Sequence, residues 1–165
     1  MILSTIQSTL LQKGYQVYSR PFELNIIGVR ANSNVPNSFD DSINIFYKGS
    51  DGKWQFQSFP ATTDPGTFWL RNPMSPQGTA ILKEGQYSGS HKLGLHRGKY
   101  LALVQQRPLS VFRDYNRNAI LDFQNGKEQT GYFGINIHHA SSNGTTKSVD
   151  QYSAGCQVFA NINDF

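Results

Sequence analysis

The chain has 165 residues, of which 38% are hydrophobic and 16% are charged. This length suits one globular domain, and this composition excludes a disordered chain. The formal net charge of +4 comes from 15 Lys and Arg residues that form no run, so we expect neither a dedicated nucleic-acid groove nor a nucleic-acid partner.

The chain contains one cysteine, Cys156, which excludes an intramolecular disulfide and a cysteine-rich zinc site. The first residues carry neither a basic segment nor a long apolar segment, so we expect a protein made without its own export signal. No stretch approaches the length that crosses a bilayer, and we expect no membrane insertion. Without a repeat or linker, residues 1–165 are interpreted as one soluble domain, and we expect a monomer.

The first predicted element is a helix. Apolar residues recur at helical spacing near the start of the chain, and Gly14 follows as a stop. This pattern predicts a short amphipathic helix over residues 2–13, within a lead-in that ends at residue 20.

From Glu23 onward apolar residues alternate with polar ones, which is typical of strands. A Pro- and Gly-rich ordered loop system is expected over residues 60–78, and a polar loop over residues 114–129. The sequence therefore predicts a mainly β domain with one short N-terminal helix. The expected strands cover residues 23–30, 42–49, 53–59, 67–70, 99–105, 109–114, 131–139 and 156–162.

The single cysteine follows a glycine-containing turn, Ser153-Ala154-Gly155-Cys156, that leads into the last predicted strand. Such a turn can expose a thiol and direct neighbouring backbone N–H groups at one point, as an oxyanion hole requires. His138 ends the preceding predicted strand, and an imidazole within hydrogen-bonding reach would convert the thiol to a thiolate. The alternative is a buried, inert cysteine beside an unrelated histidine.

Residues 138–156 resemble the signature of the L,D-transpeptidase catalytic domain (YkuD-type) family. In that signature a histidine is followed, after a spacer, by Ser or Thr, any residue, Gly and Cys; the matching positions are His138, Ser153, Gly155 and Cys156. The segment Thr63–Phe68 is similar to a Thr-Pro-x-Gly-x-Phe stretch of the same family. Two positions depart from the family pattern, because Gln157-Val158-Phe159 replaces Ile or Val followed by Arg, and His139-Ala140 replaces the usual Gly or Ser.

The resemblance implies a β-sandwich or barrel-like catalytic fold that requires no cofactor. Cys156 would attack a stem-peptide carbonyl of peptidoglycan and form a thioester, and His138 would take and later return the proton. The carbonyl of His139 would orient His138, with the Asp150 side chain as the alternative. The N–H groups of Gly155 and Cys156, in the turn that begins at Ser153, would form the oxyanion hole.

Three residues are expected to contact the substrate. His96 and Arg97 form a small basic turn that could contact an anionic group, with a solvated turn as the alternative. Gln157 follows the predicted nucleophile directly. The substrate implied by the resemblance is the peptidoglycan stem peptide.

The absence of an export signal is more typical of a phage-encoded cell-wall lysin than of a wall-building enzyme, so we expect hydrolysis rather than transpeptidation. The protein would then act at the bacterial cell wall or in the periplasm, delivered by phage lysis or in a particle. The alternatives are an L,D-transpeptidase proper, a non-catalytic wall-binding or structural phage protein, and a calcium-stabilised carbohydrate-binding module.

Metal sites are indicated by two weaker patterns. Oxygen-bearing residues at Asp114, Asn116, Asn118 and Asp122 resemble a calcium loop, although Ala119 and Asn125 stand where that loop has Gly and Glu. A structural calcium ion is therefore one interpretation, and an Asx-rich turn is the other. A zinc site is disfavoured, because only His138 and His139 are close in sequence and adjacent strand residues point to opposite faces.

Overall fold

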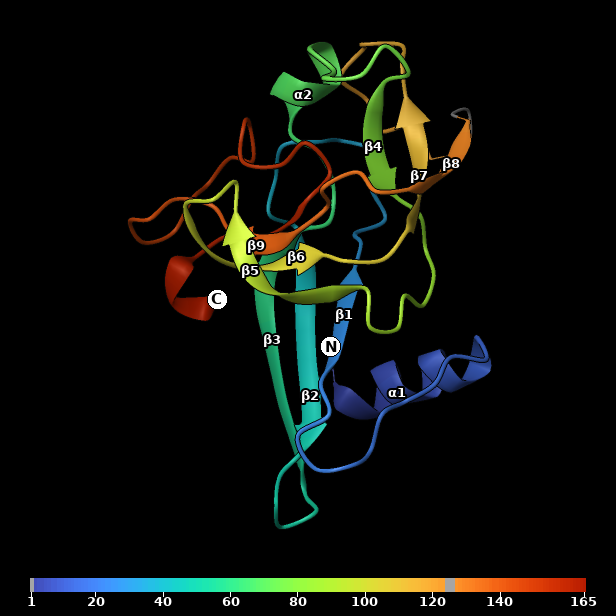
Figure 1. Ribbon diagram of the computed structural model, residues 1–165, viewed down its shortest axis with the longest axis vertical. Helices are drawn as coiled ribbons and strands as arrows, with labels where there is room; N and C mark the ends of the chain where they lie inside the picture. Colours follow the sequence, from blue (N-terminus) through green and yellow to red (C-terminus); the bar gives the residue numbers. More distant parts are fainter. Residues whose placement is uncertain (1, 124–126) are drawn as a thin grey trace.

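The computed structural model describes residues 2–123 and 127–165, and these residues form two sheets and a short N-terminal helix (Figure 1). The mainly β architecture is as the sequence predicts. Asn125, considered above for calcium, lies outside the described residues, as does part of the polar loop predicted over residues 114–129.

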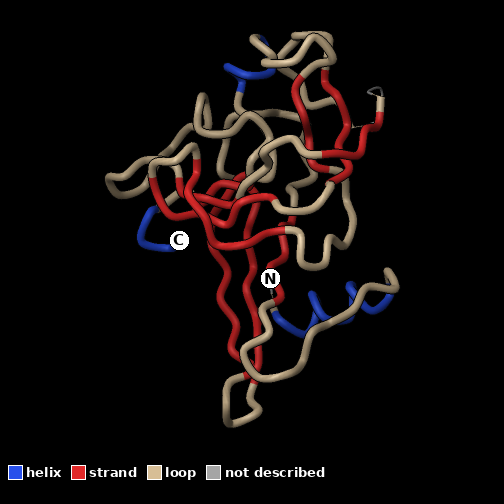
Figure 2. The backbone as a smooth tube through the Cα atoms, viewed as in Figure 1, coloured by secondary structure: helices blue, strands red, loops and turns tan. Residues whose placement is uncertain are grey.

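The larger sheet has seven strands in the order β1-β2-β3-β10-β9-β6-β5. The smaller sheet has three, in the order β4-β7-β8. The strands of the larger sheet are β1 (Asn25–Val29), β2 (Asp41–Lys48), β3 (Trp54–Thr62), β5 (His91–His96), β6 (Tyr100–Gln105), β9 (Ile137–His139) and β10 (Gln157–Phe159). Those of the smaller sheet are β4 (Thr79–Leu82), β7 (Leu109–Asp114) and β8 (Glu128–Gly131). Strands β2 and β3 extend well beyond the short strands, and loops fill much of the opposite end of the molecule (Figure 2).

Helix α1 (Leu3–Gln12) packs against apolar residues of β1, β2 and β3, and Figure 1 shows it beside the lower part of β1 and β2. Its buried residues Ile6 and Leu10 are four positions apart, so they lie on one side of the helix and pack against the fully buried Phe46 of β2. The chain turns away at Gly14, whose φ of 73° is the left-handed conformation that glycine adopts without a steric cost. The predicted helix is confirmed.

The strand predicted over residues 67–70 is wrong, because this segment forms the short helix α2 (Thr67–Arg71). Phe68 and Trp69 have the aromatic character of strand residues. A helical turn nevertheless buries Leu70 completely and lets the Trp69 indole N–H donate to the carbonyl of Gln151. Tertiary contacts therefore override the local preference for a strand.

The predicted strand over residues 131–139 is also too long, because residues 132–136 lie outside both sheets and only β9 pairs with neighbouring strands. The side chain of Gln105 replaces part of the missing ladder. Its Oε1 accepts hydrogen bonds from the N–H groups of Phe133 (3.0 Å) and Ile135 (3.1 Å). Gly134 lies between them with a φ of 70°, which an extended strand does not accommodate.

The last predicted strand, over residues 156–162, divides into β10 and a 3-10 helix at Ile162–Asp164. Strands β4 and β5 were not predicted from the sequence. Strand β8 begins at Glu128, inside the residues predicted as the end of a polar loop. In β5 the exposed positions include Leu93 and Leu95 beside Lys92, which departs from the usual polar-out pattern.

The relationship that positions the site is the parallel pairing of β9 with β10, the one parallel pair among the named strands of the described chain. Val158 lies opposite His138 in this ladder, and the N–H of Gln157 donates to the carbonyl of Asn136 at 2.9 Å. The turn that opens β10 therefore lies beside the start of β9, and His138 follows as the middle residue of that strand. Among the described residues, no helix has both the length and the apolar character needed to cross a bilayer.

Candidate active site

The turn that carries Cys156 is held by the side chain of Ser153. Its Oγ accepts a hydrogen bond from the N–H of Gly155 (3.1 Å) and donates to the carbonyl of Cys156 (2.8 Å). Gly155 has a φ of 119°, and a Cβ at this position would lie 2.4 Å from the carbonyl oxygen of Ala80 in β4. Only glycine fits here, because both the backbone conformation and the approach of β4 exclude a side chain.

The segment Thr63–Phe68 packs against the same turn. The N–H of Gly66 donates to the carbonyl of Ser153 at 2.9 Å, and a Cβ on Gly66 would lie 2.1 Å from the carbonyl oxygen of Asp150. Thr63 is held in turn by Asp41, whose Oδ2 accepts from the Thr63 N–H (2.6 Å) and hydroxyl (2.7 Å). The segment Thr63–Phe68 thus supports the Cys156 turn, although the two are far apart in the sequence.

His138 is the middle residue of β9 and is 1% exposed. Its Nδ1 is 2.7 Å from the carbonyl oxygen of His139 and 3.0 Å from the hydroxyl of Tyr100. A carbonyl oxygen only accepts hydrogen bonds, so Nδ1 carries the proton and Nε2 presents a lone pair. That Nε2 is buried and has no hydrogen-bond partner in the part of the chain that the structure describes.

Cys156 converges with two histidines. The Sγ of Cys156 and one ring nitrogen each from His138 and His96 lie within 4.8 Å of one another. The two imidazoles stack, with ring centroids 4.1 Å apart and planes inclined by 31°. The sulfur accepts a hydrogen bond from the N–H of Asn136 (3.4 Å), and the thiol donates to the carbonyl of Gly134 (3.5 Å).

The pKa values of the pair are shifted towards the neutral forms. Burial raises the pKa of the Cys156 thiol and outweighs the opposing effects of the Asn136 N–H and the Arg97 charge. Burial, together with the neighbouring charges of His96, His139 and Arg97, lowers the pKa of His138 to about 4, against the hydrogen bond to His139. These shifts favour a neutral thiol and a neutral imidazole, so any attack of the sulfur on a carbonyl would require proton transfer between them.

His96 and Arg97 come from the hairpin between β5 and β6. Arg97 and Gly98 have φ values of 50° and 71°, as a tight primed turn requires, and the turn places His96 opposite Tyr100. Arg97 is exposed, but its charge lowers the pKa values of Cys156 and His96, so it lies near the site. His96 is buried, which excludes the solvated-turn interpretation for this residue.

The tautomer of His96 follows from its hydrogen bonds. The backbone N–H of Gln105 donates to Oδ1 of Asn136 (3.0 Å), which fixes the orientation of that amide. The amide Nδ2 then lies 3.0 Å from Nδ1 of His96 and must donate to it. A neutral His96 therefore carries its proton on Nε2.

This tautomer bears on whether the three side chains could hold a metal ion. A metal on His96 Nε2 would require the proton to move to Nδ1, where it would face the N–H groups of the Asn136 amide. His138 Nε2 and the Cys156 sulfur remain as free ligand atoms, fewer than the three protein ligands of a catalytic zinc site. The cluster fits acid–base and nucleophilic chemistry better than a metal centre.

Three residues lack the contacts that their expected roles require. The Gly155 N–H already donates to Ser153, so it does not contribute to an oxyanion hole, whereas the Cys156 N–H has no acceptor among the described residues. Gln157 is buried, and its amide donates to the carbonyls of Thr63 and Gly155 (both 3.3 Å), so it holds the turn and does not face a substrate. Asp150 is exposed, and its carboxylate accepts a hydrogen bond from Asn37 rather than from His138.

The side chain of His139 makes no hydrogen bond to His138 among the described residues. It packs against Tyr100, with ring centroids 4.5 Å apart, and its Nδ1 approaches the carbonyl of Ser141 at 3.2 Å. Only the backbone of His139 touches His138 through a hydrogen bond.

The residues considered for calcium form a chain of Asx turns. Oxygens of Asn116 and Asn118 accept hydrogen bonds from backbone N–H groups two residues further on, and Asp114 accepts one from the N–H of Asp122 at 3.2 Å. Asp122 in turn accepts a hydrogen bond from the Asn116 amide. These oxygens thus have partners within the loop, and a calcium ion here stays an untested expectation.

Sequence reasoning missed Asn136 and Tyr100. Asn136 contacts the sulfur through its backbone and His96 through its side chain, and Tyr100 contacts His138. The signal for Tyr100 was its position just after the Arg97-Gly98 turn, which pairs it with His96 in the hairpin. Asn136 carried no such signal, because a polar residue beside a strand has many ordinary roles.

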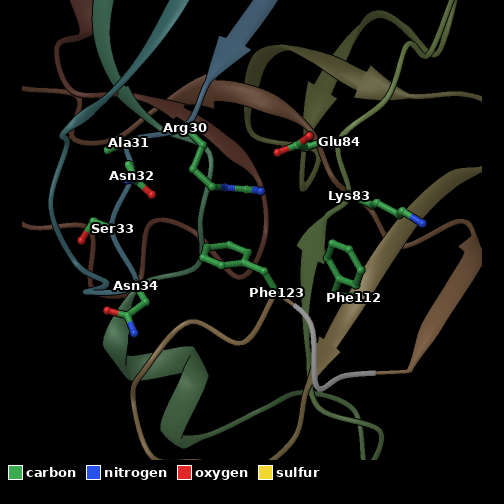
Figure 3. Close-up of a pocket in the computed structure, with 9 residues that line it drawn as sticks. All are labelled: Arg30, Ala31, Asn32, Ser33, Asn34, Lys83, Glu84, Phe112 and Phe123. Atoms are coloured by element: carbon green, nitrogen blue, oxygen red, sulfur yellow. The ribbon is translucent and has the colours of Figure 1, made fainter. Parts of the chain in front are cut away.

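A separate cavity of about 710 Å³ lies between the two sheets' loops and is lined by residues 30–34 and 83–84 with Phe112 and Phe123 (Figure 3). The guanidinium of Arg30 lies over the Phe123 ring, 4.8 Å from its centroid, and its Nε is 2.7 Å from Oδ1 of Asp64. None of the predicted site residues lines this cavity. It is therefore distinct from the Cys156 cluster.

No protein-family model, curated protein or solved structure matches this chain. Its function is consequently inferred from the residues around Cys156 and from the resemblance of residues 138–156 to the L,D-transpeptidase signature.

Proposed function

We propose that this protein is a cysteine-nucleophile enzyme that acts on the stem peptides of peptidoglycan through a thioester acyl-enzyme. The observation that carries the proposal is the buried, unpartnered Nε2 of His138 in the cluster that contains the Cys156 sulfur. A lone pair left without a donor in a buried position is costly, and it is retained at sites where it has a chemical task. Here that task is to accept the thiol proton.

The proposed reaction begins when Cys156 Sγ attacks a peptide carbonyl carbon while its proton moves to His138 Nε2. The His139 carbonyl fixes the ring by accepting from Nδ1 and stabilises the imidazolium that forms. The leaving amine takes the proton from His138, and a thioester remains. Attack by water, whose proton passes to His138, then releases the acid and the free thiol.

The choice of stem peptides rests on the resemblance of residues 138–156 and 63–68 to the L,D-transpeptidase family. The packing of Gly66 against Ser153 supports this choice, because the two segments that carry the resemblance meet at the nucleophile turn. We propose hydrolysis rather than cross-linking as the outcome. Water needs no pocket of its own, and the cavity of Figure 3 is lined by neither Cys156 nor His138. On this proposal the protein acts at the bacterial cell wall.

A second candidate is a non-catalytic wall-binding or structural protein that keeps the fold. The observation in its favour is the resting state of the thiol, which burial keeps neutral and which donates to the Gly134 carbonyl. In that case Cys156 would be an inert core residue.

Mass analysis of purified peptidoglycan after incubation separates these candidates. Wild-type protein is expected to release shortened stem peptides, and Cys156→Ala protein is expected to release none. Addition of a free amino acid tests the outcome, since exchanged peptide termini would indicate transpeptidation and unchanged ones hydrolysis. Equal product from wild-type and Cys156→Ala proteins would reject the catalytic proposal.

A further inference from the structure

We propose that His96 is a second catalytic residue, whose Nε2–H donates a hydrogen bond to the oxyanion formed when Cys156 attacks a carbonyl. This inference rests on the proposed nucleophilic role of Cys156 and deepens it. It assigns different tasks to the two stacked imidazoles, since His138 moves the proton and His96 holds the developing negative charge.

The first argument is that the site lacks a donor. A tetrahedral oxyanion is usually held by two hydrogen bonds, and the turn was expected to supply both from Gly155 and Cys156. The Gly155 N–H is instead buried and bonded to Ser153 Oγ at 3.1 Å. Of the two expected donors only the Cys156 N–H remains, and the side chains near the sulfur are the candidates for the second.

The second argument is that His96 presents a fixed donor. Asn136, itself oriented by the Gln105 N–H, donates to Nδ1 of His96, so the single proton of a neutral ring lies on Nε2. Burial and the nearby Arg97 charge lower the pKa of His96, which keeps the ring neutral. The proton is thus held in place before the substrate arrives, and no reorganisation is needed during the reaction.

The third argument concerns the place of this donor. His96 stacks on His138, and one of its two ring nitrogens lies within 4.8 Å of the Cys156 sulfur, so the ring is near the reacting centre. Its Nε2 has no acceptor among the described residues and, unlike Nε2 of His138, is not fully enclosed, so it reaches solvent. The N–H of His96 is therefore free to meet the oxygen of a carbonyl that enters the site.

In the proposed step the Sγ–C bond forms as the π pair of the carbonyl moves to its oxygen. The thiol proton goes to His138 Nε2, and the N–H groups of Cys156 and His96 both donate to the new oxyanion. His96 neither gains nor loses a proton. When the intermediate collapses, the pair returns from oxygen, the leaving group departs, and both donors are released.

Two reagents that contain neither peptide nor sugar test this role. Acylation of Cys156 by p-nitrophenyl acetate passes through an oxyanion, whereas alkylation by iodoacetamide is a displacement that forms none. His96→Phe keeps an aromatic ring against His138 but lacks the N–H. We expect its acylation rate to fall about 10²–10³-fold, the range for loss of one oxyanion donor, with alkylation changed by less than about threefold.

The matched pair His96→Gln and His96→Met covers the case in which the phenylalanine variant does not fold. The two side chains have similar length, but only glutamine can donate, so acylation should be at least about tenfold faster in the glutamine variant. His91→Gln is the control on the same strand, because its ring nitrogens are bonded to Ser90 and to the Ile135 carbonyl. It should leave both rates unchanged.

Unchanged acylation in His96→Phe, or equal loss of acylation and alkylation, would overturn the inference; the second result would make His96 a positioning residue only. The test is independent of the substrate proposal. Inert peptidoglycan together with selective loss of acylation would reject stem peptides as the substrate and retain the role of His96.

Discussion

The Nδ1 of His138 lies 2.7 Å from the carbonyl oxygen of His139, the next residue in the chain. A backbone carbonyl therefore orients the proposed base, where many catalytic sites use a carboxylate. Because this acceptor belongs to the strand itself, it stays in place whatever side chain occupies position 139. The orientation of the base is thereby a property of the β9 backbone.

The proposed mechanism predicts unequal effects of substitutions at three neighbouring positions. Cys156→Ala should abolish turnover, and Cys156→Ser should be nearly as poor, since a hydroxyl is far harder to ionise than a thiol. His138→Ala should lower the rate about 10²–10⁴-fold through loss of the general base. His139→Ala should have a much smaller effect. Product release from peptidoglycan measures each rate, and circular dichroism checks folding; a fully active Cys156→Ala protein would contradict the mechanism.

Tyr100→Phe is expected to lower the rate only about twofold to tenfold, the usual worth of one neutral hydrogen bond. The ring of Tyr100 still packs against His139, and Nδ1 of His138 keeps its bond to the His139 carbonyl. Steady-state rates of the two proteins give the comparison. A loss as large as that of His138→Ala would mean that the hydroxyl, and not the carbonyl, orients the base.

His138 should make stability fall in acid. The folded protein lowers the pKa of this ring from 6.5 to about 4. Stability linked to His138 is therefore at its maximum above pH 6.5, where the ring is neutral in both states. It falls as the pH drops towards 4, because the unfolded chain takes up the proton more readily. Relative to His138→Gln, the free energy of unfolding of the wild-type protein should drop by roughly 3 kcal/mol between pH 7.5 and pH 4.

Urea unfolding of both proteins at each pH measures this difference. Two buried carboxyls act in the opposite direction, because burial raises the pKa of Asp64 to about 7 and that of Asp114 to about 6. Their contributions to the free energy of unfolding are present at low pH and decline as the pH rises through these pKa values. Both residues occur in wild-type and variant alike, so they cancel in the comparison. A difference independent of pH would show that His138 is not held neutral by burial.

Gly155→Ala should destabilise the fold strongly and remove activity. Alanine would meet the Ala80 carbonyl oxygen at 2.4 Å and would have to adopt a φ of 119°. Gly52→Ala is the matched control, since Gly52 also has a positive φ (74°), but a Cβ there would have no heavy atom within 4 Å. We expect a loss of about 1–2 kcal/mol for the control and a clearly larger loss for Gly155→Ala. The melting temperatures of the two variants measure these losses. Equal losses would show that the close approach of Ala80 in β4 does not select glycine at position 155.

The Asx-turn interpretation of the Asp114–Asp122 loop predicts indifference to calcium, because the loop oxygens already accept hydrogen bonds within the loop. The melting temperature should be the same in millimolar calcium and in chelator. A ligand that binds only the folded state raises the melting temperature by mass action. A rise that disappears in Asp122→Asn protein would therefore establish a calcium site at this loop.

The proximity of His138 and Cys156 could be anticipated from the sequence, but the expected contact between a strand end and a strand start is wrong: β9 and β10 are parallel, so the Cys156 turn lies beside the start of β9 and His138 is the middle residue of that strand. His96 and Tyr100 could not be placed in the same way. They belong to a hairpin whose pairing with β9 is the single residue pair Leu103 and Ile137, a register that the sequence pattern does not determine. The long strands β2 and β3 were predictable because their apolar period is sustained over many residues.

The short elements were harder to predict for a physical reason. Helix α2 has five residues, too few for a helical period to be distinguished from a strand. Residues 132–136 have the composition of a strand, but the amide of Gln105 takes their N–H groups, and such a side-chain substitution for a ladder leaves no mark in the local pattern. The hydrogen bond from the Gly155 N–H to Ser153 Oγ could not be predicted from the sequence either, since it depends on the rotamer of Ser153.

The parallel alignment of β9 and β10 has a consequence for how such a chain can vary. Parallel neighbours need a crossover, so residues 140–156 must carry the chain back to the start of the next strand. The register of the sheet, and not the length of this crossover, sets the distance between base and nucleophile. Extra residues in its exposed part near Asn143 should leave the proposed chemistry unchanged, whereas one residue added between Ser153 and Cys156 should displace the sulfur. We therefore expect the distance between His138 and Cys156 to tolerate length changes in the exposed part of the interval that separates them.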